Sequence, residues 1–217
     1  MASPKKTAIK CAFYFGGLLT MTLGVALSVK AGLGVTPISS VPYTMSIVLG
    51  MELGLATSVF SIIAALLEIP ILRKDYKIAN LLQIPVSIIF GFFMSACTRL
   101  VQTLPAADAF SVRFILMLIS TVVVAVGVFA YVSSGFVPLP TEGILVSISQ
   151  KTNLKFSTLK LIGDIGMVMI SLTVCLLTIG RLGSIGLGTV VSACLTGNIM
   201  RILTKHFGAK IQELIAS

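Results

Sequence analysis

Acidic residues inside the apolar part of this chain are the side chains whose type and position could do chemistry. The chain has seven acidic residues. Four of them fall in expected loops or in the C-terminal tail: Glu52, Asp75, Asp108 and Glu213. The other three, Glu68, Glu142 and Asp164, lie within or beside long apolar runs. A carboxylate held away from water is costly unless it is paired, hydrated or protonated, so these three are candidates for binding a proton or a cation.

Glu142 and Asp164 are the two carboxylates that we expect to act together in ion coupling. Glu142 follows Pro140 and Thr141 at the start of an expected short helix, where the helix dipole favours a negative charge. Asp164 lies about two turns into an apolar helix. Two adjacent carboxylates resist double ionisation, so one would hold a proton. The structural alternatives stay open: a surface carboxylate at Glu142, and an i,i+4 pair of Asp164 with Lys160.

Glu68 and two amide side chains are open to a structural explanation. Glu68 lies just before Pro70, and we expect it to reach the membrane surface and pair with Arg73 or Lys74. Gln83 and Asn198 are polar residues within apolar helices. Hydrogen bonding between helices explains them as well as ligand binding does.

The stretch 31–50 is rich in glycine and proline and is too short and too broken to span a bilayer. Gly32 and Gly34 permit backbone conformations that other residues avoid. Thr36 is a suitable N-cap, and Pro37 fits the first turn of a helix, where its missing N–H costs nothing. We therefore predict a Gly-rich loop followed by a half-helix over about residues 37–49.

A second broken stretch, residues 134–143, repeats this pattern about a hundred residues later. Paired half-helices carry transporter binding sites because their unpaired N–H groups have partial positive charge. The alternatives are a structural re-entrant loop, or two helices lying flat at the interface. The expected substrate-binding residues are Gly32, Gly34, Thr36, Pro37, Ser39, Pro140, Thr141 and Glu142.

Composition places the chain in a membrane. Its 217 residues are 56% hydrophobic and 11% charged, with a mean hydropathy of +1.07. A soluble domain of this length needs far more charge on its surface. Because a helix needs about 20 residues to cross a bilayer, six apolar segments qualify as spans. They are residues 8–30, 53–72, 80–101, 112–133, 157–180 and 185–203.

The net charge of +9 follows the ends of these spans and does not indicate nucleic-acid binding. Twelve of the 16 Lys and Arg residues fall on one side if the N-terminus is cytoplasmic, and four, Lys30, Arg99, Arg113 and Arg181, fall on the other. The positive-inside rule then puts both termini in the cytoplasm. The first apolar segment is too long for a signal-peptide core, so we expect a retained helix. The expected location is the bacterial cytoplasmic (inner) membrane, crossed several times.

An internal repeat organises the chain. A shift of 103 residues carries Gly24 onto Gly127, Gly32 onto Gly135 and Pro37 onto Pro140. Three spans per half is an odd number, so the halves, about 8–101 and 112–204, must have opposite orientations. The predicted fold is all-α: one integral membrane domain over residues 1–217, with six transmembrane helices in a 3+3 inverted repeat and two re-entrant half-helices.

The stretch Ala31-Gly-Leu-Gly-Val-Thr-Pro37 and the later Gly183-Ser-Ile-Gly-Leu-Gly-Thr189 resemble the YczE/YyaS/YitT group of bacterial integral membrane proteins. The resemblance covers most of the chain. It implies a shared membrane fold and a presumed role in transport. Members often carry Ser-Pro-Trp-Asp where this chain has Thr36-Pro37-Ile38-Ser39, so the acidic residue of that motif is missing here.

The expected function is secondary transport of a small, anionic solute by alternating access between the two halves. One alternative is a membrane subunit that captures a vitamin-like solute for a partner ATPase, and another is a non-transporting scaffold. We expect no enzyme, because no catalytic arrangement of Ser, His, Cys and Asp is present and the only histidine, His206, lies in the basic tail. The four cysteines lack metal spacing and are expected to be buried apolar residues, so we expect no metal and no cofactor. Homodimer formation stays open.

Overall fold

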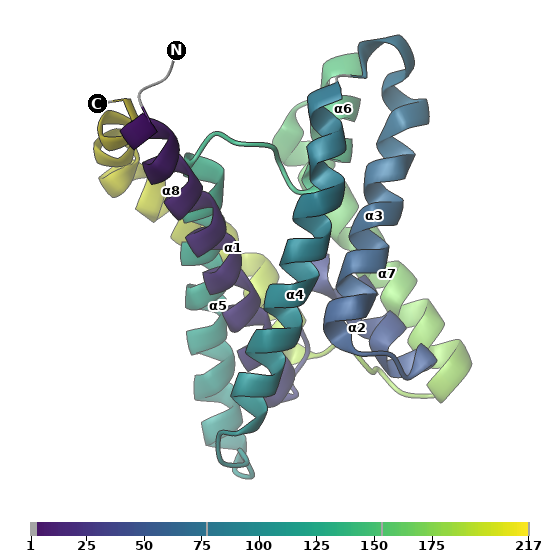
Figure 1. Ribbon diagram of the computed structural model, residues 1–217. Helices are drawn as coiled ribbons and strands as arrows, with labels where there is room; N and C mark the ends of the chain where they lie inside the picture. The colour runs from purple at the N-terminus through teal and green to yellow at the C-terminus, as the bar shows by residue number, and fades with distance from the viewer. Residues whose placement is uncertain (1–3, 77, 153, 217) are drawn as a thin grey trace. The chain divides into compact units, whose positions relative to one another are not determined.

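The computed structural model describes residues 4–76, 78–152 and 154–216, and the described chain is helical throughout, with no strand. Figure 1 traces the elements along the chain. The α-helices are α1 (Pro4–Ala31), α2 (Pro37–Leu49), α3 (Leu53–Leu72), α4 (Gln83–Gln102), α5 (Phe110–Ser133), α6 (Pro140–Lys151), α7 (Phe156–Ile179) and α8 (Leu187–Ala216). Two 3₁₀ turns, η1 (Arg73–Asp75) and η2 (Ile78–Leu82), join α3 to α4.

Six of these helices are long and apolar enough to cross a membrane, which confirms the six expected spans. They are α1, α3, α4, α5, α7 and α8. The two short helices expected at Pro37 and Pro140 also exist, and each begins at its proline. A proline suits the first helical position because its fixed φ matches the helix and no N–H partner is needed there.

Two expectations, one about the last helix and one about the cysteines, need correction. The sixth span was expected to end near residue 203, but α8 continues as one helix to Ala216, so the basic tail is helical. Burial was expected for all four cysteines. Cys97 and Cys175 are buried, whereas Cys11 is half-buried and Cys194 is exposed. In a membrane protein an exposed apolar residue can face lipid, so exposure of Cys194 carries no cost there.

The helices group into two compact units, and each unit takes members from both halves of the chain. Unit 1 holds α1, α5, α8 and the end of α4, from Ala96 onward. Unit 2 holds α2, α3, α6, α7 and the start of α4, up to Ser95. The first helix of each half therefore belongs to unit 1, whereas the half-helix and the following helix of each half belong to unit 2.

In unit 1, α1 and α5 pack closely as antiparallel helices. A Cβ atom on Gly17 would lie 2.4 Å from the backbone N of Tyr131, and one on Gly24 would lie 2.7 Å from the backbone N of Val124. Since the earlier residue of α1 meets the later residue of α5, the two helices run in opposite directions. Any side chain at these two glycines would push the backbones apart. Small residues allow this kind of close approach between helices in membranes.

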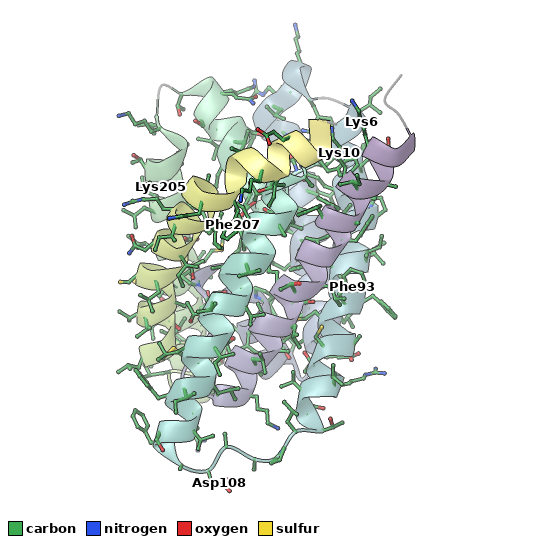
Figure 2. The ribbon with its side chains drawn as sticks, turned by 90° about the vertical axis from the view of Figure 1, so that its left-hand side faces the viewer. Lys6, Lys10, Phe93, Asp108, Lys205 and Phe207 are labelled. Carbon is green, nitrogen blue, oxygen red and sulfur yellow. The ribbon has the colours of Figure 1, made fainter. Side chains whose placement is uncertain are left out.

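Charged residues of unit 1 are separated along its length. Figure 2 shows Lys6 and Lys10 toward one end of α1 and Asp108, in the loop before α5, at the opposite end of the unit. Lys30 lies at the end of α1 and donates a hydrogen bond to the carbonyl oxygen of Leu104 in that same loop, over 2.6 Å. The start of α1 and the end of α8 lie at the same end of unit 1 (Figure 1).

In unit 2, each short helix runs parallel to a long helix from the other half of the chain. Ser171 of α7 donates a hydrogen bond to Ser40 of α2 over 3.0 Å, and one turn further along both helices Cys175 lies 3.6 Å from Thr44. The short helix α6 is held against α3 in the same way, because Ser147 contacts Glu68 and Lys151 reaches Leu72. Figure 1 shows α2 and α6 at opposite ends of unit 2.

Candidate functional site

The start of α2, which is the first helix of unit 2, is buried. Pro37 and Ser39 are buried, and Ser40 is buried one residue later. The first turn of α2 contains no acidic residue, so no carboxylate on that turn offsets the partial positive charge of the helix start. Thr36, the expected N-cap, is buried and belongs to unit 1. Chemically, the start of α2 favours a negatively charged or hydrogen-bond-accepting group.

Gly32 and Gly34 shape the loop that leaves α1, and both have positive φ angles, of 62° and 102°. The Arg113 side chain of α5 donates hydrogen bonds to the carbonyl oxygens of Ala31, over 2.7 Å, and Gly32, over 2.6 Å. A cation at the end of a helix is favoured by the helix dipole. The loop also meets α8, because the backbone N–H of Gly188 donates to the carbonyl of Leu33 over 2.6 Å. These contacts give both loop glycines a structural role within unit 1.

The start of α6 carries the first of the two expected coupling carboxylates. Pro140 and Thr141 are buried, and Glu142 is half-buried at the third position of the helix. Burial raises the pKa of Glu142 from its ordinary 4.5 to about 7. The charge of Lys160 opposes that rise in pKa, and the charge of Asp164 adds to it. A carboxyl group with this pKa exchanges its proton near neutral pH.

Asp164, the second expected coupling carboxylate, pairs with Lys160. The Lys160 ammonium and the Asp164 carboxylate are 2.7 Å apart on α7, at i,i+4 spacing, and both side chains are partly exposed. The pair that was the structural alternative is therefore present. Since both charges act on Glu142, unit 2 brings three charged groups together at the start of α6.

Glu68 does not reach the surface to pair with Arg73 or Lys74, so that expectation was wrong. Its side chain is 2% exposed. One carboxylate oxygen, Oε1, accepts hydrogen bonds from Asn80 over 2.9 Å and from Ser147 over 2.7 Å. Arg73 and Lys74 themselves are exposed. The packing of α6 and of the turn η2 around the end of α3 closes off water from Glu68.

Sequence reasoning singled out Gln83 but did not link it, or Ser147 and Asn80, to Glu68. Gln83, the first residue of α4, is 1% exposed, and Ser147 is 3% exposed. The sequence does show polar side chains within apolar segments, which could have indicated a buried polar cluster. Nothing in the spacing of Asn80 and Gln83, however, indicates that they lie near α6, about sixty residues later. Asn198, in contrast, donates to the carbonyl of Cys194 in its own helix and links no helices through that bond.

The expected site residues divide between the two units. Pro37, Ser39, Pro140, Thr141, Glu142 and Asp164 belong to unit 2, whereas Gly32, Gly34 and Thr36 belong to unit 1. Within unit 2 the structure brings Glu142 and Asp164 into electrostatic contact, and it holds α2 and α6 against α7 and α3.

Comparisons with known proteins find relatives of this chain in bacteria, one of which is named a membrane protein. It is 26% identical over 198 residues to the uncharacterised membrane protein YczE of Bacillus subtilis, covering 91% of this chain and 86% of YczE. It is 24% identical over 209 residues to the uncharacterised protein YyaS of the same organism, covering 93% of this chain and 98% of YyaS. An uncharacterised protein of Haemophilus influenzae is 26% identical over 184 residues, covering 85% and 78% of the two chains.

No solved structure matches this chain. The resemblance to YczE and YyaS that the Gly-rich stretches indicated is confirmed, and the protein is an all-helical membrane protein with six candidate spans. The model of a family of unknown function, DUF6198, matches residues 8–205, and the chain belongs to that family.

Proposed function

We propose that the protein is a secondary transporter of a small, anionic solute, that it works by alternating access, and that it is not an enzyme. The observation that carries the proposal is the pair of Pro-initiated short helices in unit 2. Each packs in parallel against a long helix of the other half, α2 on α7 and α6 on α3. Transporters built from repeats place substrate and ion sites at such broken helices.

Two sets of contacts support an inverted repeat. Gly24 of α1 contacts Val124 of α5. The residues at the corresponding positions of the other half, Gly127 (24 plus 103) and Met21 (124 minus 103), also contact each other. The same operation carries the Ser171–Ser40 contact onto that of Glu68 with Gly143. Contacts that exchange in this way are those of a two-fold axis. Because α1 and α5 are antiparallel, an axis relating them lies across the helices, as an inverted repeat requires.

The two short helices would then enter from opposite membrane faces and divide the chemistry of transport. We assign the negatively charged group of the solute to the start of α2, with Pro37 and Ser39, because no acidic residue occupies its first turn. We assign the coupled proton to Glu142 at the start of α6, next to the Lys160–Asp164 pair. Gly32, Gly34 and Thr36 keep the chain leading into α2 in position.

The proposed topology puts both termini in the cytoplasm of a bacterial inner membrane. Lys6, Lys10 and the basic tail of α8 lie at the opposite end of unit 1 from Asp108 (Figure 2). In a variant that lacks Cys11 and Cys194, a cysteine introduced at position 108 should react with an impermeant thiol reagent added outside intact cells. Labelling only after permeabilisation would invert this topology.

The direct test of transport is reconstitution of the purified protein alone into lipid vesicles. Candidate solutes come from a metabolite panel screened for thermal stabilisation, since a true ligand raises apparent stability by mass action. We expect the stabilising anionic solute to enter the vesicles, and to do so faster with a proton gradient. Ligand binding without flux would favour the capture subunit, and neither binding nor flux would favour the scaffold.

The coupling assignment is tested with conservative variants in the same vesicles. We expect Glu142→Gln and Asp164→Asn to reduce the pH dependence of uptake, and Asp164→Asn to impair coupled uptake more than Glu68→Gln does. Each substitution keeps size and hydrogen-bonding capacity while it removes the titratable charge. An unchanged pH dependence in Asp164→Asn would return Asp164 to a structural partner of Lys160.

A further inference from the structure

Three polar side chains from three elements of unit 2 are buried together at the end of α3. Glu68 comes from α3, Gln83 from the first turn of α4 and Ser147 from the middle of α6. Each is 3% exposed or less. Buried polar atoms normally have hydrogen-bond partners, so the atoms in this cluster that lack one require an explanation.

The hydrogen bonds around Glu68 satisfy only one of its two carboxylate oxygens. Oε1 accepts from Asn80 Nδ2 and from Ser147 Oγ. Among the described residues, Oε2 has no hydrogen-bond partner, and neither amide atom of Gln83 has one. The cluster therefore contains a carboxylate oxygen, an amide N–H group and an amide oxygen, all buried and all unused.

Gly143 on α6 holds these unused groups near each other. A Cβ atom on Gly143 would lie 2.7 Å from Nε2 of Gln83 and 3.1 Å from Oε2 of Glu68. Both atoms therefore border the same small space over the Cα atom of Gly143. A side chain at position 143 would occupy that space, which only glycine leaves open.

We propose that Glu68 is a proton-binding site and that Gln83 serves both of its protonation states. When Glu68 is ionised, Oε2 can accept a hydrogen bond from Nε2 of Gln83. When a proton from water binds a lone pair of Oε2, the new O–H group can donate to Oε1 of Gln83 after the amide turns by half a revolution. A primary amide can do this because it carries a donor and an acceptor of nearly the same shape.

The composition of the cluster favours a proton over a metal ion or an anion. Mg²⁺ and Ca²⁺ take six or more oxygen ligands, whereas Glu68 Oε2 and Gln83 Oε1 are the only unused oxygens here. In the part of the chain that the structure describes, no group of three His, Cys, Asp or Glu residues could hold a metal ion. A carboxylate would repel an anion. A proton needs one oxygen and one neutral partner, and both are present.

Charged and titratable groups lie on several of the elements packed around Glu68. On α6, Lys151 donates to the carbonyl of Leu72 one turn beyond Glu68, and Glu142 precedes Gly143. On η1, Arg73 and Lys74 are exposed, and beyond it partial burial and the negative charge of Glu68 raise the pKa of Tyr76. On α2, burial raises the pKa of Tyr43. The α4 segment 83–95 has no titratable side chain.

Infrared difference spectroscopy of the purified full-length protein, titrated with pH, tests the proposal without any assay of transport. A protonated carboxyl group has a C=O stretching band that is distinct from the bands of a carboxylate. Because Glu142 also binds a proton near neutral pH, Glu142→Gln is the parent protein, and we expect one such band from a buried acid to appear and disappear with pH in it. It should be lost completely when Glu68→Gln is added to this parent, and unchanged when Glu213→Gln is added, which removes an exposed carboxyl group from the tail.

Two further variants locate the band at this cluster. Gly143→Ala should shift the band because the added Cβ displaces Gln83 or Glu68, and Gln83→Leu should shift it by removing the amide partner. Both variants also serve if Glu68→Gln does not fold. The proposal is overturned if the Glu142→Gln parent has no titrating band from a buried acid, if the band persists when Glu68→Gln is added, or if neither Gly143→Ala nor Gln83→Leu moves it.

Discussion

Two contacts in unit 2 occupy corresponding places in the two halves of the chain, yet they differ in chemistry. At one, Ser171 of α7 donates a hydrogen bond to Ser40 of α2. At the other, Glu68 of α3 lies against Gly143 of α6. A shift of 103 residues relates Ser40 to Gly143 and Glu68 to Ser171. The first contact is neutral and satisfied, whereas the second contains a buried carboxylate with an unused oxygen.

Two helix contacts at corresponding sequence positions can therefore differ in chemistry, because the side chains at each contact differ. Hydroxyl groups at α2 and α7 hold two helices together and have no charge to exchange. The paired α6 and α3 carry the ionisable groups, with Glu68 in the buried contact and Glu142 at the start of α6. On the proposed inverted repeat, one end of unit 2 would bind the solute and the other would exchange protons.

The largest expected effect tests the packing that relates the two halves. Gly127→Leu should destabilise the protein by about 3 kcal/mol or prevent its accumulation, because overpacking of this kind costs up to about that amount. A Cβ atom at position 127 would lie 2.4 Å from the backbone N of Met21, which cannot move without moving α1. The measurement is the free energy of unfolding in mixed detergent micelles.

Gly16→Leu is the matched control for that packing, because a Cβ on Gly16 meets no atom within 4 Å. It should leave the free energy of unfolding nearly unchanged. Equal losses in the two variants would show that close approach of α1 and α5 does not hold unit 1 together, and the contact-based support for the repeat would fail.

The second effect concerns the charged end of unit 2. Burial raises the pKa of Glu142 to about 7, so the folded protein holds a proton that the unfolded chain releases above about pH 4.5. The free energy of unfolding should therefore fall as pH rises from about 4.5 to about 7, by at most about 3 kcal/mol, and level off beyond that. The comparison is a pH series of unfolding curves for the wild type and Glu142→Gln.

In Glu142→Gln this fall should disappear, while Glu213→Gln should retain it. The corresponding residue of the neutral end, Ser39, has no proton to exchange, and Ser39→Ala should keep the wild-type slope. A wild-type slope that survives in Glu142→Gln would assign the proton uptake to another group.

Smaller effects compare the two corresponding contacts directly. Glu68→Ala should cost about 2 kcal/mol, because Asn80 and Ser147 lose hydrogen bonds to a charged acceptor, although Ser147 keeps the carbonyl oxygen of Gly143 as an acceptor. Thermal or denaturant unfolding of the purified variant measures the cost. A stabilised Glu68→Ala variant would mean that the buried carboxylate costs more than its hydrogen bonds return, as happens for some buried charges.

Ser171→Ala should give the smallest loss, about 1 kcal/mol, which is the typical net contribution of one neutral hydrogen bond. Ser40 would keep its bond to the carbonyl of Pro37, so no buried donor is abandoned. The same unfolding assay applies. A loss at Ser171 as large as that at Glu68 would remove the energetic difference between the two ends of unit 2.

Local features of the sequence determined most of the helices. Each span is a run of about twenty apolar residues, and each short helix starts at a proline, Pro37 or Pro140. Both kinds of helix can therefore be predicted from the sequence without knowing which helices pack against them. The Lys160–Asp164 pair was legible for the same reason, since residues four apart on one helix always lie side by side.

The tertiary structure alone decided which helices meet, and with them the environment of the polar groups. A hydrophobic run indicates that a helix is buried in lipid or protein, but it does not identify which other helix packs against each of its faces. From the sequence, Glu68 is therefore expected to be a surface carboxylate. In the structure, α6 and η2 enclose it and contribute Ser147 and Asn80 as hydrogen-bond donors. Likewise, the hydrogen bond from Arg113 to the carbonyl oxygen of Gly32 joins residues that are 81 positions apart in the sequence. The burial and hydrogen bonding of a side chain depend on which helix packs against it. Sequence periodicity cannot give this information, because it describes only the helix that carries the side chain.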